Sequence, residues 1–254
     1  MQRKKLLILV SPIAILVLWQ IASLLNIVNP LFLPTPYETA LKLVELLASA
    51  EAGVTIWPDI FATLYRMLVS FALAAIIGIP LGLVMGYSDK IYYSLEFFVD
   101  FFRSLPATAM FPLFMLFFGI GDESKIAVTA FACALIIVVN TMYGVHHASK
   151  LRIMAAKIMK AGKTKLFTKV IFPDALPGTF AGMRIAVSLA LIIIIVTEMF
   201  IGTNFGLGRR IIDAQLVYRI PEMYAAIIIA GVLGFIVNTV FVWIEKRTVH
   251  WTGK

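Results

Sequence analysis

Six apolar stretches dominate the sequence, and most of them are long enough to cross a lipid bilayer as a helix. A hydrocarbon layer about 30 Å thick requires about 20 helical residues, because backbone polar groups must be satisfied internally in lipid. The stretches comprise residues 6–25, 67–87, 105–120, 126–145, 185–202 and 224–244. The sequence therefore predicts an all-α membrane protein with six transmembrane helices, forming one domain over residues 1–254.

The composition indicates the same class. Hydrophobic residues make up 61% of the 254 residues and charged residues 14%, and the mean hydropathy is +0.96. These values exclude an ordinary soluble domain. The net charge of +8 does not indicate nucleic acid, because the basic residues lie in short connections where membrane topology accounts for them. The single cysteine, Cys133, leaves no intrachain disulfide.

The distribution of basic residues predicts the topology. Six spans place both termini on one side of the membrane, and that side carries 16 of the 22 Lys and Arg residues. Cytoplasmic connections are the ones enriched in Lys and Arg, so we expect both termini and the connection 150–184 in the cytoplasm. The first apolar stretch follows the basic sequence MQRKK and is too long for a signal-peptide core, which indicates an uncleaved signal anchor.

The first outer connection contains a helix-start signal. Thr35, Pro36 and Glu38 have the order of an N-cap, a first-turn proline and the acid of a capping box. We expect an interfacial helix to follow, with a plain solvated loop as the alternative.

The connection 150–184 is the one long polar segment between apolar stretches. Apolar residues recur at helical spacing over 151–161, and Gly162 then predicts a break. A second short helix over 164–171 is expected to end at Pro173, with a further stop signal at Pro177. A helix, a turn and a helix held at the membrane surface would form a compact docking surface for another protein.

Two spans carry residues of special backbone character. Gly78, Gly82 and Gly86 form a small-xxx-small ladder that allows close approach of a second helix. Pro106 and Pro112 interrupt the third span, and broken helices at membrane depth are tolerated where they line a wet cavity or are buried in protein. This span is therefore a candidate lining of a translocation pathway, with a packing kink as the alternative.

Two polar residues inside apolar stretches are further pathway candidates. Glu198 lies toward the outer end of the fifth span, where a carboxylate requires a counter-charge, a protein partner or water. A structural hydrogen-bonding role and a substrate-gating role both remain open for it. Asn140 in the fourth span lines the pathway or, more simply, bonds across helices.

No constellation for catalysis or metal binding is present in the sequence. His146 and His147 are adjacent and do not share a helix face, and His250 lies near the C-terminus. Gly162, Lys163 and Thr164 match the tail of a phosphate-binding loop, but Lys157 stands where its first glycine belongs. The chain is therefore predicted to be no enzyme and to bind no cofactor or metal. A transporter of this kind draws on an ion gradient or on a separate nucleotide-hydrolysing partner.

The stretches FLPTPYETA, GIPLGLVMG and FFRSLPATAMFPLFMLFFGIG, together with the connection 150–184, resemble the membrane permease subunits of bacterial ABC importers in the sulfonate, taurine and nitrate branch. The resemblance spans nearly the whole chain and implies a type I importer fold in the bacterial inner membrane. It also implies a homodimer or related heterodimer of permeases, two P-loop ATPase subunits that hydrolyse ATP on the cytoplasmic side, and an extracytoplasmic solute-binding protein.

By the same resemblance, the connection holds the coupling helix, which fits a groove on the ATPase. The residues that this assigns to coupling are Ile153, Met154, Ala155, Ala156, Lys160, Gly162 and Pro173. Two of them depart from the family pattern, since Met154 replaces a glutamate and Lys160 replaces a glycine. These changes shift the charge of the contact by about two units, so we expect an altered groove on the partner.

Two other functions remain as alternatives. A gradient-driven secondary transporter or channel would use paired intramembrane acids, of which only Glu198 is a candidate. A membrane-embedded enzyme would need a nucleophile, a base and a metal together. Within the importer branch, pyrimidine vitamin precursors are an alternative cargo.

Overall fold

A computed structural model describes the backbone of residues 2–51, 53–200 and 203–251, with side chains from Val10 onward. The described part is helical. Its elements are α1 (Gln2–Leu24), α2 (Pro36–Ala48), α3 (Trp57–Tyr87), α4 (Asp89–Ser104), η1 (Ala107–Met110), α5 (Phe111–Phe118), α6 (Asp122–His146), α7 (Lys150–Ile158), α8 (Lys163–Leu166), η2 (Phe167–Ile171), α9 (Phe172–Phe200), α10 (Leu207–Leu216) and α11 (Ile220–Thr248).

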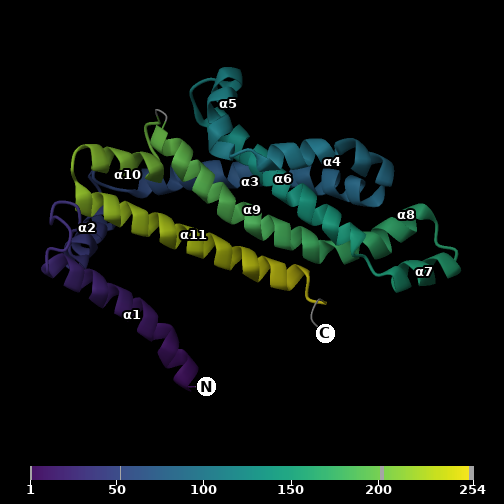
Figure 1. Ribbon diagram of the computed structural model, residues 1–254, viewed down its shortest axis with the longest axis horizontal. Helices are drawn as coiled ribbons and strands as arrows, with labels where there is room; N and C mark the ends of the chain where they lie inside the picture. The colour runs from purple at the N-terminus through teal and green to yellow at the C-terminus, as the bar shows by residue number, and fades with distance from the viewer. Residues whose placement is uncertain (1, 52, 201–202, 252–254) are drawn as a thin grey trace.

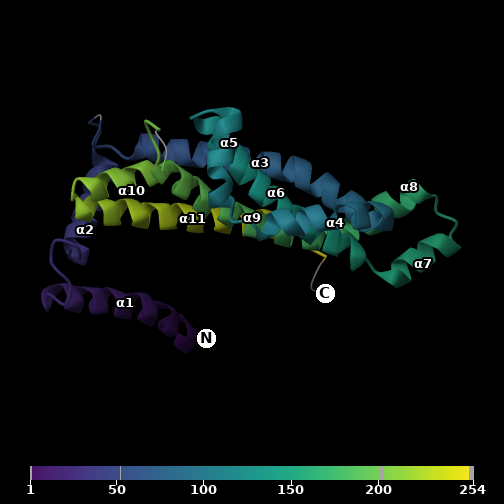
Figure 2. The ribbon, with the colours of Figure 1, turned by 45° about the horizontal axis from the view of Figure 1, so that its top comes forward.

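The long helices α3, α6, α9 and α11 lie side by side and give the molecule its elongated shape (Figure 1). The short helices α2 and α10 lie at one end of this bundle, and α7 and α8 project from the opposite end (Figures 1 and 2). We call these the α10 end and the α7 end. Polar segments at both ends of an apolar bundle are the arrangement expected of a membrane-spanning protein.

Four helical stretches are long and apolar enough to cross a membrane: 57–87, 122–146, 163–200 and 220–248. A fifth crossing is possible if α4 and the η1–α5 segment, which are bent by 93° relative to each other, count as one broken span. The described part therefore contains four to five candidate spans. The apolar helix over Val10–Leu24 is shorter, and it is the segment where the first of six spans is expected.

The predicted third span, residues 105–120, is broken at Pro106, whereas Pro112 lies in the first turn of α5 and does not interrupt it. Leu105 is extended, with ψ of 133°, as expected for a residue that precedes a proline, and Pro106 therefore separates α4 from η1. The longer helix of the pair is α4, which hydropathy does not select because charged residues are interspersed among its aromatic residues. Helix α5 projects sideways from the bundle in both views (Figures 1 and 2).

The helix that contains the predicted fifth span, 185–202, begins well before residue 185. Pro173 and Pro177 do not stop the helix, since α8, η2 and α9 run on as one helical stretch from Lys163 to Phe200. The turn η2 is a π-helix, in which the N–H of Phe172 reaches the carbonyl of Phe167, five residues back. Pro173 directly follows this π-turn, whose wider hydrogen-bond pattern lets the helix continue past a residue that lacks an N–H. Residues 201–202 of the predicted span lie outside the described residues.

The three glycines Gly78, Gly82 and Gly86 face α6 at close range. A Cβ atom at Gly82 would lie 2.6 Å from the Val138 carbonyl oxygen, and one at Gly86 would lie 2.6 Å from Val145 Cβ. Only residues without a side chain allow two helix backbones to come this close. A glycine also allows close packing of α6 on α9, where a Cβ at Gly182 would lie 2.5 Å from Asn140 Cβ.

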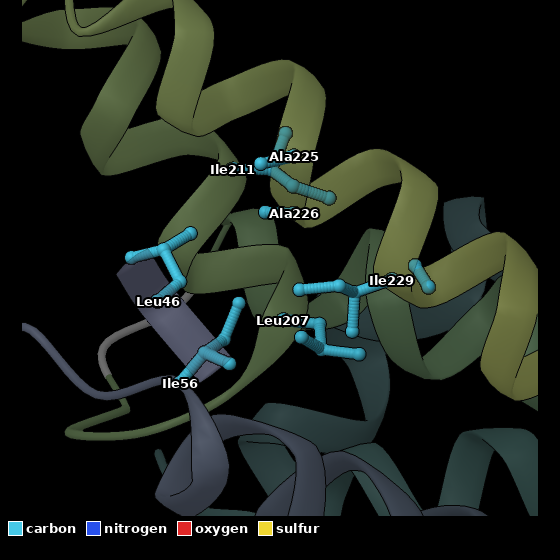
Figure 3. Close-up of a cluster of buried hydrophobic side chains, with 8 residues drawn as sticks. Leu46, Ile56, Leu207, Ile211, Ala225, Ala226 and Ile229 are labelled. Atoms are coloured by element: carbon cyan, nitrogen blue, oxygen red, sulfur yellow. The ribbon is translucent and has the colours of Figure 1, made fainter. Parts of the chain in front are cut away.

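The predicted capping box of α2 is confirmed. Thr35 Oγ1 accepts from the Glu38 N–H at 3.1 Å, and Glu38 Oε2 accepts from the Thr35 N–H at 2.9 Å. Helix α2 is thus a real helix, and the solvated-loop alternative is wrong. Its Leu46 packs with Ile56, Leu207 and residues of α11 in a buried apolar cluster at the α10 end (Figure 3).

Helix α1 is attached mainly at its C-terminal end. Trp19 Nε1 donates to the Pro34 carbonyl at 2.9 Å, and its ring stacks on Tyr224 with centroids 5.7 Å apart. Most side chains from Val10 to Leu24 are exposed, and the helix lies apart from the bundle (Figure 1).

Candidate functional sites at the two ends of the bundle

Helix α7 is clamped to the bundle by one buried carboxylate. Asp174, in the first turn of α9, accepts from the Ser149 N–H at 2.9 Å and pairs with Arg152 at 2.8 Å. Ser149 is also the N-cap of α7 and accepts from the Arg152 N–H at 3.4 Å. The start of α7 is therefore fixed relative to α9 by a charge-assisted bond.

The two faces of α7 differ in what they contact. Ile153 and Ala156 are half-buried and pack against an apolar cluster that includes Val145 and Leu166. Leu151, Met154 and Ile158 point outward, with exposed fractions of 79%, 62% and 82%. An apolar helix face exposed at the tip of a projecting segment is a candidate interaction surface.

Helix α7 ends in a left-handed turn that is occupied by Lys160. Its φ is 55°, and the N–H groups of Lys160 and Ala161 donate to the carbonyls of Lys157 and Ala156. This pair of bonds is a Schellman motif, in which glycine is the usual residue at the Lys160 position because a side chain there costs about 1 kcal/mol. The left-handed backbone favours glycine at this position. Lys160 adopts the same conformation although it carries a side chain.

The segment around α7 is strongly basic. Residues 150–174 contain seven Lys and Arg residues and one acidic residue, Asp174, whose side chain is only 6% exposed. Six lysines of α7 and the segment that follows it are exposed, namely Lys150, Lys157, Lys160, Lys163, Lys165 and Lys169.

A buried ionic cluster lies at the α10 end. Glu198 of α9 is fully buried, and its Oε1 lies 2.5 Å from Arg66 Nη1 of α3. The Nε of the same arginine donates to Asp122 of α6 at 2.8 Å. Thr63, one turn before Arg66, donates to Glu198 Oε2 at 2.9 Å. The carboxylate is compensated by a guanidinium and a hydroxyl, as a buried charge requires.

The same cluster caps helix α10. Its first N–H groups are bonded by side chains of other helices: Gly206 donates to Asp59 at 2.9 Å, Leu207 to Thr63 Oγ1 at 2.9 Å, and Gly208 to Glu198 at 3.0 Å. Two carboxylates at a helix N-terminus also complement its dipole. Glycine is required at 208, since a Cβ there would lie 2.1 Å from the Ile195 carbonyl oxygen.

Arg210 extends these contacts to the neighbouring segments. Its Nε lies 3.0 Å from Glu222 of α11 and 3.7 Å from Asp59, and its Nη1 donates to the Gly53 carbonyl at 3.0 Å. The polar cluster thus holds α3, α6, α9, α10 and α11 together at this end.

The structure does not bring the predicted pathway residues together. Glu198 lies in the buried cluster, and Pro106 and Pro112 lie at the break after α4 and in the first turn of α5. Asn140 donates to the Ile136 carbonyl of its own helix at 2.9 Å, rather than to another helix. In the described part of the chain, no group of three or more His, Cys, Asp or Glu residues is arranged for a metal ion.

The partners of Glu198 are missed by sequence reasoning, which counts Arg66 only as a basic residue of a connection. A signal was available, because Asp59, Thr63 and Arg66 lie at positions i, i+4 and i+7 and therefore on one face of α3. The partners of this face on other helices, Asp122 of α6 and Glu198 of α9, could not be predicted from the sequence, because no sequence spacing relates them to α3.

The arrangement of the helices matches a known fold of membrane proteins. The chain superposes on a membrane chain of the MetNI methionine ABC transporter, described in inward-facing conformations, with a TM-score of 0.66 and 21% sequence identity, over 75% of this chain and 94% of that one. At this identity the likeness shows the fold alone.

Sequence similarity identifies the family to which the chain belongs. Residues 78–250 match the model of the binding-protein-dependent transport system inner membrane component, and the chain belongs to this family. It is 28% identical to SsuC of Bacillus subtilis (strain 168), which is assigned to aliphatic sulfonate transport, over 96% of this chain and 86% of that protein. It is 27% identical to the taurine transport system permease protein TauC of Escherichia coli (strain K12), over 94% and 87%.

A third relative is the nitrate import permease protein NrtB of Synechocystis sp., which is 29% identical over 92% of this chain and 86% of that protein. The chain is accordingly a multi-pass permease component of an ABC importer in the inner membrane, and it is not itself the catalytic subunit. ATP is hydrolysed by a partner ATPase, and a binding protein is the second partner that membership of the family implies.

Proposed function

We propose that this chain is the permease of an importer for a small solute of the sulfonate, taurine or nitrate type, delivered by an extracytoplasmic binding protein. The kinship with permeases for these solutes supports the cargo class. In this proposal α1 and the bent α4–α5 segment are both membrane spans, which gives six crossings with both termini and the α7 end in the cytoplasm.

We infer that α7 is the coupling helix that docks on the partner ATPase. The observation that carries this proposal is the exposed apolar face of Leu151, Met154 and Ile158, presented by a helix whose opposite face is packed on the bundle. Ile153 and Ala156 serve the helix differently, because they attach it to the permease. Gly162 and Pro173 shape the turn and the start of α9.

The lysines around this face predict the chemistry of the partner. An apolar centre with a cationic rim fits a groove that is apolar at its floor and acidic at its edge. Met154 and Lys160 are the two positions that depart from the family pattern, and both departures make the docking surface less acidic. The ATPase that pairs with this chain is expected to carry the compensating acids.

Two copies of the permease pair around one pathway in this proposal, with two ATPase subunits attached. The projecting helix α5 carries two exposed apolar side chains, Leu116 and Phe117, which are 83% and 73% exposed and which a second subunit would cover in this proposal. The extended backbone at Leu105 also needs cover at membrane depth, which a second subunit would provide. ATP-driven closure of the ATPase pair then moves both α7 helices as rigid bodies.

The docking proposal is tested with Leu151→Asp and Ile158→Asp, purified with the cognate ATPase. We expect each variant to insert and fold normally and to lose at least tenfold of the co-purifying ATPase and of the transport-coupled hydrolysis. The matched control is Leu216→Asp at the α10 end, where the side chain is 70% exposed. Retention of the ATPase by both α7 variants would overturn the docking role.

A further inference from the structure

A polar patch lies within the membrane-spanning part of the bundle, on the outer surface of α9 and α11. Arg184 and Ser188 are exposed and lie one turn apart on α9, and Arg184 Nε lies 3.4 Å from Asn238 Oδ1 on α11. The two helices run side by side in both views (Figures 1 and 2). Sequence reasoning counts Arg184 only as a cytoplasmic charge.

The depth of Arg184 follows from its neighbours. Gly182 abuts Asn140, which is six residues before the end of α6 at His146. Arg184 therefore lies roughly 12 Å inside the α7 end of the bundle. In the other direction, sixteen residues separate it from Phe200, which corresponds to about 24 Å of helix. The two distances add to about 36 Å, so a hydrocarbon layer about 30 Å thick that is centred on this stretch contains the backbone of Arg184.

An arginine at this depth is costly in lipid, and ionisable residues inside membrane segments face protein or a water-filled cavity. The neighbours of Arg184 indicate which environment applies here. Two adjoining hollows of about 430 and 630 Å³ lie between α9 and α11, and they share Ser188, Ile192 and Asn238. The guanidinium of Arg184, the hydroxyl of Ser188 and the amide of Asn238 thus line one otherwise apolar groove. Glu245 of α11 lines the same hollow as Arg184.

The groove also has open space at its outer half. A Cβ atom at Gly231 would meet no atom within 4 Å, which contrasts with the tightly packed glycines of α3. The room next to the patch is therefore not filled by the chain itself. Its size is that of sites for small molecules.

We propose that Arg184, Ser188 and Asn238 form a contact site for a small oxyanion on the translocation path. This inference rests on the proposed function and adds to it a residue that recognises the cargo. A guanidinium binds planar or tetrahedral oxyanions through paired N–H donors, and a hydroxyl and an amide supply further donors. Nitrate and the sulfonate group of taurine have this chemistry, and the relatives that transport them span nearly the whole chain.

Charged thiol reagents test the site without knowledge of the natural cargo. The only native cysteine is buried at 133, so a Cys133→Ala background leaves Ser188→Cys as the single target. The full transporter in membrane vesicles is treated on both faces with an anionic and a cationic methanethiosulfonate of similar size. The ratio of their reaction rates reports the local charge, and the same ratio is measured after Arg184→Gln and after Arg184→Lys.

We expect Ser188→Cys to react from water and to favour the anionic reagent. Arg184→Gln should lower the anionic-to-cationic rate ratio about tenfold, because a unit charge nearby acts in opposite directions on the two reagents. Arg184→Lys should keep the ratio within about twofold, which separates charge from packing. The position control is Ile76→Cys on α3, which is 68% exposed and lies at a similar distance from the α7 end.

Two results would overturn the inference. If the cysteine of Ser188→Cys reacted as slowly as the cysteine of Ile76→Cys, the groove would be covered by lipid or protein and not filled with water. An unchanged rate ratio in Arg184→Gln would show that the arginine does not act on anions there. Neither result bears on docking of the ATPase, which the α7 variants measure separately, so failure of this site and failure of the proposed function are distinguishable.

Discussion

Arg66 and Glu198, which are 132 positions apart in the sequence, form a buried ion pair with their nearest atoms 2.5 Å apart. The pair connects α3 to α9 at the α10 end of the bundle, and Glu198 simultaneously caps α10 through the Gly208 N–H. Removing one member would leave the other charge buried and uncompensated. The ion pair is therefore a structural requirement of the α10 end, whatever further role its location gives it.

We predict that Arg66→Met lowers the free energy of unfolding by about 3–5 kcal/mol, because it leaves the buried carboxylate of Glu198 without its counter-charge. Thermal unfolding of the detergent-solubilised protein measures this as a strongly lowered Tm. The control is Arg103→Met, because Arg103 pairs with Asp100 at 3.2 Å at the surface, where such pairs contribute at most about 1 kcal/mol. Equal Tm values for the two variants would refute a structural role for the buried pair.

The contact between α3 and α6 predicts which glycines tolerate a side chain. Gly82→Val should abolish the folded protein, since its Cβ would lie 2.6 Å from a backbone oxygen of α6. Gly231→Ala, at an open position on α11, should leave the folded yield unchanged. Size-exclusion chromatography of the solubilised proteins measures both yields. A monodisperse, fully expressed Gly82→Val protein would contradict the observed close approach of the helices.

Lys160 predicts a stabilising substitution. Its left-handed backbone costs about 1 kcal/mol relative to glycine, so Lys160→Gly should slow hydrogen exchange of the amides around residues 159–161 about fivefold. Lys157→Gly removes the same charge from within α7 and should accelerate exchange there, because glycine weakens a helix interior by about 1 kcal/mol. Similar effects from both substitutions would mean that charge, not the backbone, controls the turn.

Asp174 predicts how α7 can be released from the bundle. Asp174→Asn weakens its bonds to Arg152 and to the Ser149 N–H, which should cost about 1–3 kcal/mol and increase hydrogen exchange across residues 149–158. Overall thermal stability should change little, since the clamp acts at one end. Asp100→Asn, in an exposed pair, serves as the control and should leave α7 unchanged. Unaltered exchange in Asp174→Asn would show that the apolar contacts of Ile153 and Ala156 hold α7 by themselves.

The sequence predicts the elements whose causes are local. The cap of α2 depends on residues three positions apart, and four of the long apolar helices depend on runs of their own residues. Hydropathy fails at α4 because charged residues interrupt its apolar surface. The proline stop signal fails before α9, where a π-turn allows the helix to continue past Pro173.

The sites are less predictable than the helices because they depend on contacts between distant segments. Glu198 is recognisable as an anomaly in an apolar stretch, but Arg66 becomes its partner only when α3 and α9 lie together. Arg184 is likewise unremarkable until α11 places Asn238 beside it. Even the two sides of α7 follow from packing, since helical spacing alone does not tell which side attaches to the bundle.

The uninterrupted helical stretch from Lys163 to Phe200 has a mechanical consequence. Its 38 residues correspond to a rod about 57 Å long that carries the α7 segment near one tip and Glu198 near the other. A tilt of about 5° at such a rod's base displaces its far tip by about 5 Å, comparable to one helical turn. The π-turn at Phe167–Ile171 and the prolines at 173 and 177 interrupt the regular hydrogen bonding near its α7 end only. If α7 binds the ATPase as proposed, a displacement of α7 would therefore reach the Glu198 end through regular helix.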